Sequence, residues 1–266
     1  MTADLLQTIV AAARRSAEAR ASRTRSARSS PSRTPRGSMF EASLRRDGIR
    51  IIAECKKRSP SRGILRARYD PEQIARGYAA AGAAAISVLT EPTFFAGSLD
   101  HLKAVRAAVD VPVLRKDFVV SKFQIDEAVD AGADAVLLIV GGLTRGDLRD
   151  LMAHGRALGL AALVEIHDRA ELETALTEGA TIMGVNSRNL RTLDVDVALF
   201  DELAPLIPPG VVAVAESGLR SGADLARLRA LRYNAFLIGE RLMTTPDPGR
   251  ALGDVLSAAA AEGGAR

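Results

Sequence analysis

Polar and charged side chains stand at or just after the ends of several apolar segments of this 266-residue chain. They are Glu54, Lys56, Lys116, Glu165, Asn186 and Glu216. A single charge at such a place is usually a solvated edge or a structural ion pair. A whole set is harder to explain in this way, because buried charges must be paired or used. Carboxyl and ammonium groups together supply general acids and bases, which predicts a reaction with several proton transfers on an anionic substrate.

Two glycine-containing sequences indicate a phosphate site near these residues. Ser217-Gly218 follows one apolar segment, and Gly239 ends another. Glycine lets a ligand approach the backbone closely, and backbone N–H groups at a helix N-terminus bind phosphate. The sequence from Ser59 to Gly63 could add further donors or form an ordinary turn.

Other candidate residues carry weaker signals. The three histidines, His101, His154 and His167, lack the spacing of metal ligands, so we expect them in surface or capping roles. Phe94 and Phe95 are either core residues or walls for an aromatic substrate.

The segments that position these groups are short apolar runs, which predict strands buried on both faces of a parallel sheet. The strand period of two places Glu54 and Lys56 on one face and Cys55 on the other. Cys55 should therefore pack against a layer of helices. The predicted strands are residues 49–54, 84–89, 112–115, 135–139, 161–165, 182–186, 211–216 and 235–239.

Helix signals lie between these runs. Asp70-Pro71 is typical of an N-cap followed by proline at the first helical position, and Ser98, Ser121 and Asp168 are further candidate N-caps. Three glycines stand where a helix C-terminus needs a left-handed residue, at positions 82, 132 and 179. Their spacings of 50 and 47 residues fit pairs of βα units.

Eight such units favour a closed barrel over an open sheet. No Gly-x-Gly-x-x-Gly follows the first strand, as an open dinucleotide-binding fold would need. The predicted fold class is therefore α/β, a (β/α)8 TIM barrel with an N-terminal helical extension. We expect a basic extension with helices over residues 1–47 and the catalytic barrel over residues 48–266.

The composition fits this domain and marks the N-terminus as unusual. The chain is 47% hydrophobic, has a formal net charge of +4 and contains one cysteine, which fits a reducing compartment. The first 36 residues are rich in Arg and Ser, as in an organelle transit peptide. The spacing of apolar residues from Leu5 to Ala13 favours an amphipathic helix followed by a solvated linker. The segment from Arg20 to Arg36 is expected to pack poorly.

Several strand-end sequences also occur in a characteristic order. They are Ile52–Ser61, Ser87–Glu91, Phe94–Leu99, Val113–Phe118, Leu163–His167, Gly184–Leu190, Ala215–Gly218 and Phe236–Glu240. From about Pro35 to Leu252, the chain resembles the indole-3-glycerol-phosphate synthase family of tryptophan biosynthesis. The resemblance implies a carboxy-lyase that converts 1-(2-carboxyphenylamino)-1-deoxyribulose 5-phosphate to indole-3-glycerol phosphate, with release of CO₂ and water. It implies no metal and no organic cofactor.

The resemblance further implies roles for the residues that match the family motifs. Lys116 would be the general acid on the substrate carbonyl. Lys56, oriented by Glu54, would pair with the carboxylate lost as CO₂ and donate a proton in dehydration. Glu165 would stabilise cationic intermediates and handle protons. Groups that position the anilino nitrogen and nearby charges would be Asn186 and Glu216.

The same resemblance implies which residues contact the two ends of the substrate. The phosphate would be held by Ser59, Ser217, Gly218, Gly239 and the backbone N–H of Glu240. The aromatic end would be lined by Phe95, Phe118 and Leu190, and Arg188 would support the rim.

Two other functions stay open from the residues alone. A barrel lysine can attack a sugar-phosphate carbonyl, as in a Schiff-base aldolase. The basic N-terminus could bind nucleic acid, although it lacks the interleaved aromatic residues that favour single-strand binding. We expect a small anionic substrate as the partner, rather than nucleic acid or a membrane, and contact with other enzymes of tryptophan biosynthesis. The expected location is the cytoplasm, with organelle targeting by the N-terminus left open.

Overall fold

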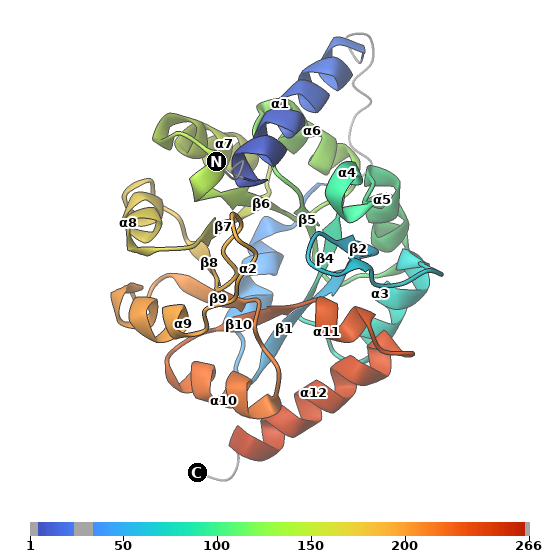
Figure 1. Ribbon diagram of the computed structural model, residues 1–266, viewed down its shortest axis with the longest axis vertical. Helices are drawn as coiled ribbons and strands as arrows, with labels where there is room; N and C mark the ends of the chain where they lie inside the picture. The colour runs from blue at the N-terminus through green and yellow to red at the C-terminus, as the bar shows by residue number, and fades with distance from the viewer. Residues whose placement is uncertain (1–4, 24–33, 264–266) are drawn as a thin grey trace.

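The computed structural model describes residues 5–23 and 34–263, and within these ranges eight parallel strands form a closed barrel (Figure 1). The barrel strands are β1 Arg50–Cys55, β4 Ala85–Leu89, β5 Val113–Lys116, β6 Ala135–Ile139, β7 Ala161–Ile166, β8 Ile182–Asn186, β9 Val212–Glu216 and β10 Ala235–Ile238. Closure joins the first strand to the last, because Ile51 of β1 is in register with Phe236 of β10. The predicted (β/α)8 barrel is confirmed, and each strand ends within one residue of its predicted bounds.

Helices connect the strands and surround them. They are α3 Pro71–Ala80, α4 Pro92–Phe95, α5 Leu99–Ala108, α6 Lys122–Asp130, α7 Arg145–Ala157, α8 Arg169–Thr177, α9 Ala198–Leu203, α10 Gly222–Ala230, α11 Glu240–Met243 and α12 Pro248–Gly263, with 3-10 turns η1 Val140–Gly142 and η2 Ala204–Leu206. The predicted caps are confirmed, since a backbone N–H at each helix start donates to the side chain of Asp70, Ser98, Ser121 and Asp168.

One connection contains strands that the sequence did not predict. The loop after β1 folds into a small antiparallel hairpin of β2, Arg58–Ser59, and β3, Gly63–Ile64. Gly63 has a φ of 70°, a left-handed conformation that glycine adopts without strain. The sequence from Ser59 to Gly63 is therefore a structured projection beside the end of β1.

Buried apolar side chains form two clusters on opposite sides of the sheet. The outer cluster fills the space between the strands and the helices and includes Cys55, which confirms its predicted outward direction. The inner cluster fills the barrel, with Ile52, Leu114 and Leu163 among its members. This separation lets successive residues of one strand serve different layers.

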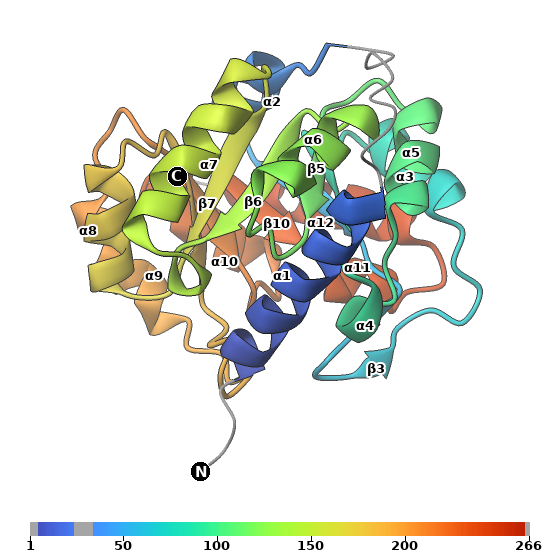
Figure 2. The same ribbon diagram turned by 90° about the horizontal axis from the view of Figure 1, so that it is seen from above.

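Two helices before β1 also join the inner cluster. Helix α2, Gly37–Arg45, contacts β1, β4, β7 and β9 and buries Phe40 and Leu44 completely. Helix α1, Leu5–Arg23, lies beside α6 and contributes buried Ile9 to the same cluster (Figures 1 and 2). The predicted amphipathic helix at the N-terminus is thus confirmed, and it packs on the barrel.

The expectation that the segment from Arg20 to Arg36 packs poorly is wrong at both of its described ends. Arg20 Nε lies 2.7 Å from Glu127 Oε1, and Arg36 Nε lies 3.5 Å from Asp134 Oδ1. Acidic side chains on the barrel therefore offset the basic charge of these residues. Residues 24–33, the centre of the Arg/Ser-rich stretch, lie outside the described residues. No helix in the described part of the chain is long and apolar enough to cross a membrane.

The packing of α2 predicts a large loss of stability for Phe40→Ala. Phe40 is fully buried, so its truncation removes apolar contacts and leaves a cavity, which costs about 3–5 kcal/mol. We expect a clear fall in the midpoint of urea denaturation followed by circular dichroism. Met39→Ala is the matched control, because Met39 is 48% exposed. Equal effects of the two substitutions would contradict the packing described for α2.

Candidate active site

A cavity of about 710 Å³ lies at the ends of the barrel strands. Every residue that the family resemblance places in the site lines it, whereas Phe94, the other candidate wall residue, packs against the inner cluster instead. The site residues are Glu54, Lys56, Ser59, Phe95, Lys116, Phe118, Glu165, Asn186, Arg188, Leu190, Glu216, Ser217, Gly218, Gly239 and Glu240. The structure therefore brings together groups that lie almost 190 residues apart in the chain, a separation that follows from the numbering of Glu54 and Glu240.

Four charged residues form the centre of this cavity. Glu54, Lys116, Glu165 and Glu216 come from β1, β5, β7 and β9, which alternate around the barrel. Inward side chains of alternate strands form one layer in this fold. Lys116 Nζ lies 3.2 Å from Glu165 Oε2 and 3.6 Å from Glu216 Oε2. The three glutamates are at most 2% exposed, so this charged layer is held away from bulk water.

Two glycines on the intervening strands make room for the carboxyl groups. A Cβ atom at Gly184 in β8 would collide with Glu216 Oε1, and one at Gly239 after β10 would collide with Glu54 Oε1. A larger residue at either position would displace a carboxyl group of the layer. Gly239 thus has a steric role in addition to its predicted place beside the phosphate.

The charges of the layer shift one another's pKa values. Burial alone would lower the pKa of Lys116, but Glu165, Glu216 and Glu54 raise it above its ordinary value. Burial would raise the pKa of Glu165, yet Lys116 holds it well below the usual range. Burial raises the pKa of Glu216 to about 8, with Glu165 and Glu54 adding to the shift and Lys116 opposing it. At neutral pH the layer therefore holds a charged ammonium, a carboxylate at Glu165 and a protonated carboxyl at Glu216.

Lys56 forms a second ion pair at the edge of the layer. Its Nζ lies 2.7 Å from Glu54 Oε1, as the shared strand face of the two residues predicts. Glu54 Oε2 and Glu216 Oε1 are buried without a hydrogen-bond partner in the protein. Glu54 and Glu216 both line the cavity, together with Lys56 and Lys116, so these two oxygens are candidate partners for a bound molecule.

His167 does not line the cavity but pairs with Glu165 of the charged layer, a contact that the sequence reasoning missed. Its Nε2 lies 3.2 Å from Glu165 Oε1, and its Nδ1 lies 3.1 Å from Glu171 Oε2. Burial would lower the pKa of His167, but Glu165 and Glu171 raise it to about 10. The expected surface or capping role is wrong for this histidine, because its side chain is only 13% exposed and lies between the carboxyl groups of Glu165 and Glu171. The strand period of two could have found it, since residues 165 and 167 share a face.

The other two histidines are also absent from the cavity lining. His101 packs edge-on against Tyr69, and His154 Nε2 lies 2.9 Å from Asp126 Oδ1. Among the residues that the structure describes, no group of three or more His, Cys, Asp or Glu could hold a metal ion.

Asn186 connects the charged layer to the loops after β8 and β9. Its Nδ2 donates to Glu165 Oε1 at 3.1 Å, and its Oδ1 accepts from Ser217 Oγ at 2.7 Å. The same oxygen accepts from the backbone N–H of Arg188 at 3.0 Å. The Arg188 guanidinium donates to the carbonyl of Leu193, which braces the loop after β8. The predicted rim support by Arg188 thus has a specific backbone contact.

The predicted phosphate-binding residues gather at one side of the cavity. Ser217 and Gly218 both have left-handed backbone conformations, with φ of 66° and 68°. Because the Ser217 hydroxyl is engaged by Asn186, the backbone N–H groups of this turn are the donors it offers to a ligand. At the same side, Arg62 of the β2–β3 hairpin forms an ion pair of 2.8 Å with the side chain of Glu240.

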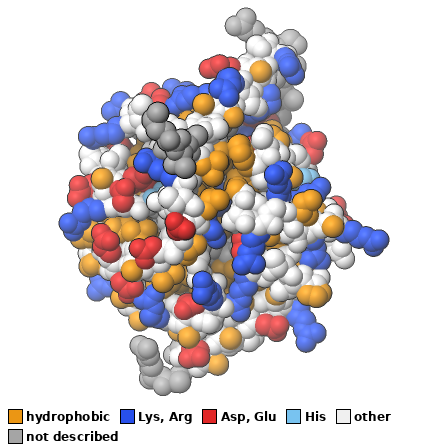
Figure 3. Space-filling model, in the orientation of Figure 1, with side chains coloured by type: hydrophobic (Ala, Val, Ile, Leu, Met, Phe, Trp, Pro, Cys, Tyr) orange, Lys and Arg blue, Asp and Glu red, His pale blue; other side chains and the backbone are white. Residues whose placement is uncertain are grey.

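Apolar residues line another part of the cavity. Phe95 and Phe118 have ring centroids 6.3 Å apart, and Leu190 packs with the same inner cluster. Glu91 caps α4 by accepting from the backbone N–H of Phe95 and two preceding residues, which fixes this ring at the cavity. Helix α1 adds Leu5 and Ile9, two wall residues that the sequence reasoning did not assign to the site. Figure 3 shows hydrophobic side chains gathered in the middle of the displayed face, with charged side chains around them.

Comparison with known protein families decides the assignment. The family model described as indole-3-glycerol phosphate synthase matches residues 6–255. The chain belongs to the indole-3-glycerol phosphate synthase family. It is 48% identical over 206 residues to the indole-3-glycerol phosphate synthase of Sulfurimonas denitrificans, covering 77% of this chain and 78% of that protein. It is 51% identical over 210 residues to the indole-3-glycerol phosphate synthase of Chlorobium luteolum, covering 78% of this chain and 80% of that protein.

Solved structures agree on the fold of this indole-3-glycerol phosphate synthase family member. A mandelate oxidase variant superposes with a TM-score of 0.63 and 17% identity, over 81% of this chain and 74% of that one. Thiamine phosphate pyrophosphorylase from Pyrococcus furiosus superposes with a TM-score of 0.61 and 14% sequence identity. The match covers 82% of this chain and 98% of that one. At such low identity these likenesses describe the barrel alone. The family assignment itself indicates an enzyme that acts on a small phosphate-bearing molecule.

The raised pKa of Glu216 predicts a pH-dependent stability that Glu216→Gln removes. Unfolded chains release this proton near pH 4.3, whereas the folded protein keeps it until about pH 8. The folded state therefore binds more protons between these pH values, and the free energy of unfolding falls as pH rises. Glutamine cannot ionise, so the variant lacks this pH dependence. Between about pH 5 and pH 8, its free energy of unfolding should therefore rise by at least about 1 kcal/mol relative to that of wild type.

Urea denaturation at a series of pH values measures this difference. Glu72→Gln, which removes an exposed carboxyl from α3, controls for loss of a glutamate far from the cavity. A stability difference between Glu216→Gln and wild type that stays constant over the whole range would mean that Glu216 is already ionised at its lower end.

Proposed function

We propose that this chain catalyses the ring closure, decarboxylation and dehydration of 1-(2-carboxyphenylamino)-1-deoxyribulose 5-phosphate to indole-3-glycerol phosphate. The observation that carries the proposal is the charged layer of Glu54, Lys116, Glu165 and Glu216 inside one cavity. An apolar wall on one side suits the anilino ring, and backbone donors on the other side suit the phosphate. The family assignment names the same reaction product.

The chemistry of this conversion defines what the site must do. The ring carbon that bears the carboxylate attacks the ketone carbon, and a proton goes to the ketone oxygen. The C–C bond to the carboxylate then breaks, CO₂ leaves, and its electron pair restores the aromatic ring. Protonation of the new hydroxyl expels water, and loss of one proton from the adjacent CH₂ completes the indole. The site delivers two protons, one to the ketone oxygen and one to the departing hydroxyl, and removes one from the CH₂ group. The net uptake of one proton balances the negative charge that disappears when the carboxylate leaves as CO₂.

Lys116 is suited to the first proton transfer. It is charged at neutral pH because the surrounding carboxylates raise its pKa, and it stands at the end of β5 in the cavity. After delivery of the proton, the protonated carboxyl of Glu216, 3.6 Å from Lys116 Nζ, lies close enough to restore it. A positioned general acid of this kind contributes about 10²–10⁴-fold in rate.

The remaining groups fit the later steps. Lys56, held by Glu54, is placed to pair with the substrate carboxylate and to protonate the departing hydroxyl. Attack by the ring places positive charge on the nitrogen, and the carboxylate of Glu54, whose Oε2 has no partner in the protein, can stabilise that charge. Glu165, ionised and fixed by Lys116, Asn186 and His167, is suited to stabilise the cation and accept the final proton.

The Schiff-base aldolase alternative is weakened by the same electrostatics. Imine formation needs a neutral amine, but the carboxylates around Lys116 favour its ammonium form, and Lys56 is paired with Glu54. Borohydride treatment in the presence of substrate distinguishes the two, because a covalent adduct on either lysine would support the aldolase. Nucleic-acid binding is also weakened, because Arg14, Arg20 and Arg36 are paired with acidic side chains of the barrel.

Three wider assignments belong to this proposal. Residues 1–47 would act as an extension to a catalytic domain of residues 48–266. The single cysteine supports a reducing compartment, and we propose the cytoplasm. Contact with other enzymes of tryptophan biosynthesis would suit a shared pathway, and copurification of those enzymes would test it.

We expect purified protein, without added metal, to convert the anilino-deoxyribulose phosphate to indole-3-glycerol phosphate. Formation of the indole ring gives a fluorescence signal that follows the reaction continuously. Activity should survive treatment with a chelator, because lysine and carboxyl groups supply the proton transfers. No turnover at any pH from about 6 to 9, where such catalysts normally operate, would refute the proposed function.

Substitution of Lys116 tests its role as the acid. We expect Lys116→Ala to lower kcat by about 10²–10⁴-fold while circular dichroism shows a folded barrel. Cys55→Ala, at the end of the barrel strand β1, is the matched control, because Cys55 faces the outer helices and should affect stability more than kcat. A Lys116→Ala variant that keeps more than about a tenth of the wild-type kcat would exclude Lys116 as the general acid.

A further inference from the structure

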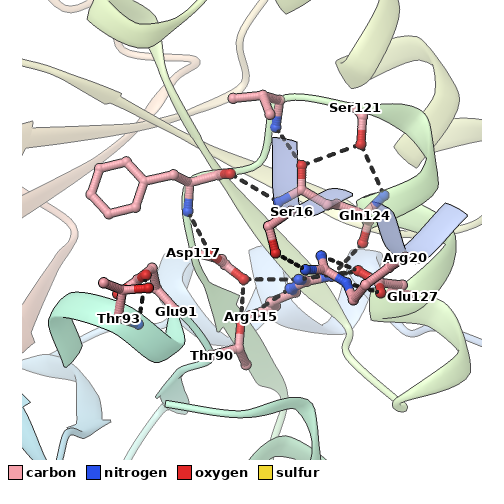
Figure 4. Close-up of polar contacts among 12 residues, drawn as sticks. Ser16, Arg20, Thr90, Glu91, Thr93, Arg115, Asp117, Ser121, Gln124 and Glu127 are labelled. Atoms are coloured by element: carbon pink, nitrogen blue, oxygen red, sulfur yellow. Dashed lines mark hydrogen bonds and ion pairs between the residues drawn. The ribbon is translucent and has the colours of Figure 1, made fainter. Parts of the chain in front are cut away.

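A second polar cluster lies behind the charged layer, on the outer side of β5 (Figure 4). Arg115 precedes Lys116, so strand alternation turns its guanidinium away from the cavity and toward α6. Its side chain is 1% exposed, and a buried guanidinium needs partners for its donors. We define the β5 cluster as Arg20, Thr90, Arg115, Asp117, Gln124 and Glu127.

Arg115 holds the centre of the β5 cluster. It donates to Asp117 Oδ2 at 2.8 Å, to Thr90 Oγ1 at 3.1 Å and to the carbonyl of Gln124 at 2.5 Å. Thr90 in turn donates to the same Asp117 oxygen at 2.6 Å. The side chain of Asp117 is therefore fixed immediately after Lys116.

The β5 cluster also fixes the backbone that follows Lys116. The N–H of Phe118 donates to Asp117 Oδ1 at 2.8 Å, and the N–H of Val120 donates to Gln124 Oε1 at 2.9 Å. Gln124 Nε2 donates to the carbonyl of Phe118 at 2.9 Å. Lys116 and Phe118 both line the cavity, so the β5 cluster sets the position of two of its walls.

Helix α1 reaches the β5 cluster through Arg20. The Arg20 guanidinium donates twice to Glu127, at 2.7 and 3.0 Å, and once to Ser16 Oγ at 2.6 Å. Glu127 Oε2 also lies 3.5 Å from both terminal nitrogens of Arg115. One carboxylate thus joins an arginine of α1 to an arginine of the barrel.

The charges of the β5 cluster balance only when α1 is docked. Arg20 and Arg115 face the carboxyl groups of Asp117 and Glu127. Without Arg20, one guanidinium would face two carboxylates at a largely buried place. Because an unbalanced buried charge is costly, docking of α1 and order in the segment after Lys116 should stabilise each other.

We propose that Arg20 and Glu127 are positioning residues for the reaction. Their ion pair holds α1 in place, so that Leu5 and Ile9 stay in the cavity wall, and through Arg115 it also steadies the segment from Lys116 to Val120. Only the kinetic consequence of this proposal rests on the proposed function. The structural coupling between α1 and the segment can be measured without turnover.

Hydrogen–deuterium exchange of the full chain tests the coupling. We expect Arg20→Gln to speed exchange about 3- to 10-fold in α1 and in the peptide covering residues 117–124, which reports the amides of Phe118 and Val120. Arg14→Gln is the matched control, because it removes the same charge from the same helix but from an exposed pair with Asp147. The control should leave exchange in residues 117–124 unchanged.

Kinetics test the consequence for the reaction. We expect Arg20→Gln to raise KM about 3- to 10-fold with a smaller change in kcat, and Arg14→Gln to match wild type. High salt should raise the KM of wild type toward that of Arg20→Gln, because ions screen the partly exposed pair. In a Glu127→Gln background, Arg20→Gln should have no further effect, since its partner is already lost.

Two results would overturn the proposal. One is unchanged exchange in residues 117–124 of Arg20→Gln, and the other is an effect of Arg20→Gln that persists in full beside Glu127→Gln. A protein that turns over no substrate refutes the proposed function instead, and the exchange measurements still decide whether the β5 cluster couples α1 to the segment.

Discussion

Burial of three carboxyl groups around one ammonium group is the constraint on which the rest of this structure depends. Lys116 neutralises Glu165, and Lys56 neutralises Glu54. The third carboxyl, Glu216, has no cation of its own and keeps a proton instead, as its raised pKa indicates. The layer is thus close to electrically neutral while it contains an acid, a base and two unpartnered acceptor oxygens.

The barrel satisfies this constraint by where it places ordinary residues on its strands. Alternate strands deliver the charged side chains, and the strands between them contribute Gly184 and Gly239, which leave the necessary space. Behind the layer, further charges occur as balanced groups. His167 lies between Glu165 and Glu171, and Arg115 lies between Asp117 and Glu127. Each buried charge therefore has a partner that also orients it.

The strands and most of the site could be predicted from the sequence because both follow local rules. Buried parallel strands appear as continuous apolar runs, and the polar residues that end them converge at one rim. The hairpin β2–β3 could not be predicted, because two-residue strands are too short to show alternation. The proton on Glu216 depends on distances between β5, β7 and β9, and no local pattern contains these. The partner of Arg20 is 107 residues away, so composition alone indicated a solvated segment.

The position of α1 and α2 ahead of β1 has a consequence for how the chain folds. Both helices enter the inner cluster, and α2 contacts strands as late in the sequence as β9. Closure of the barrel also waits for β10, which pairs with β1. During synthesis the first helices therefore leave the ribosome long before their binding surface exists. Such non-local pairing slows folding and leaves the apolar faces of Phe40 and Ile9 in need of protection until the last strand arrives.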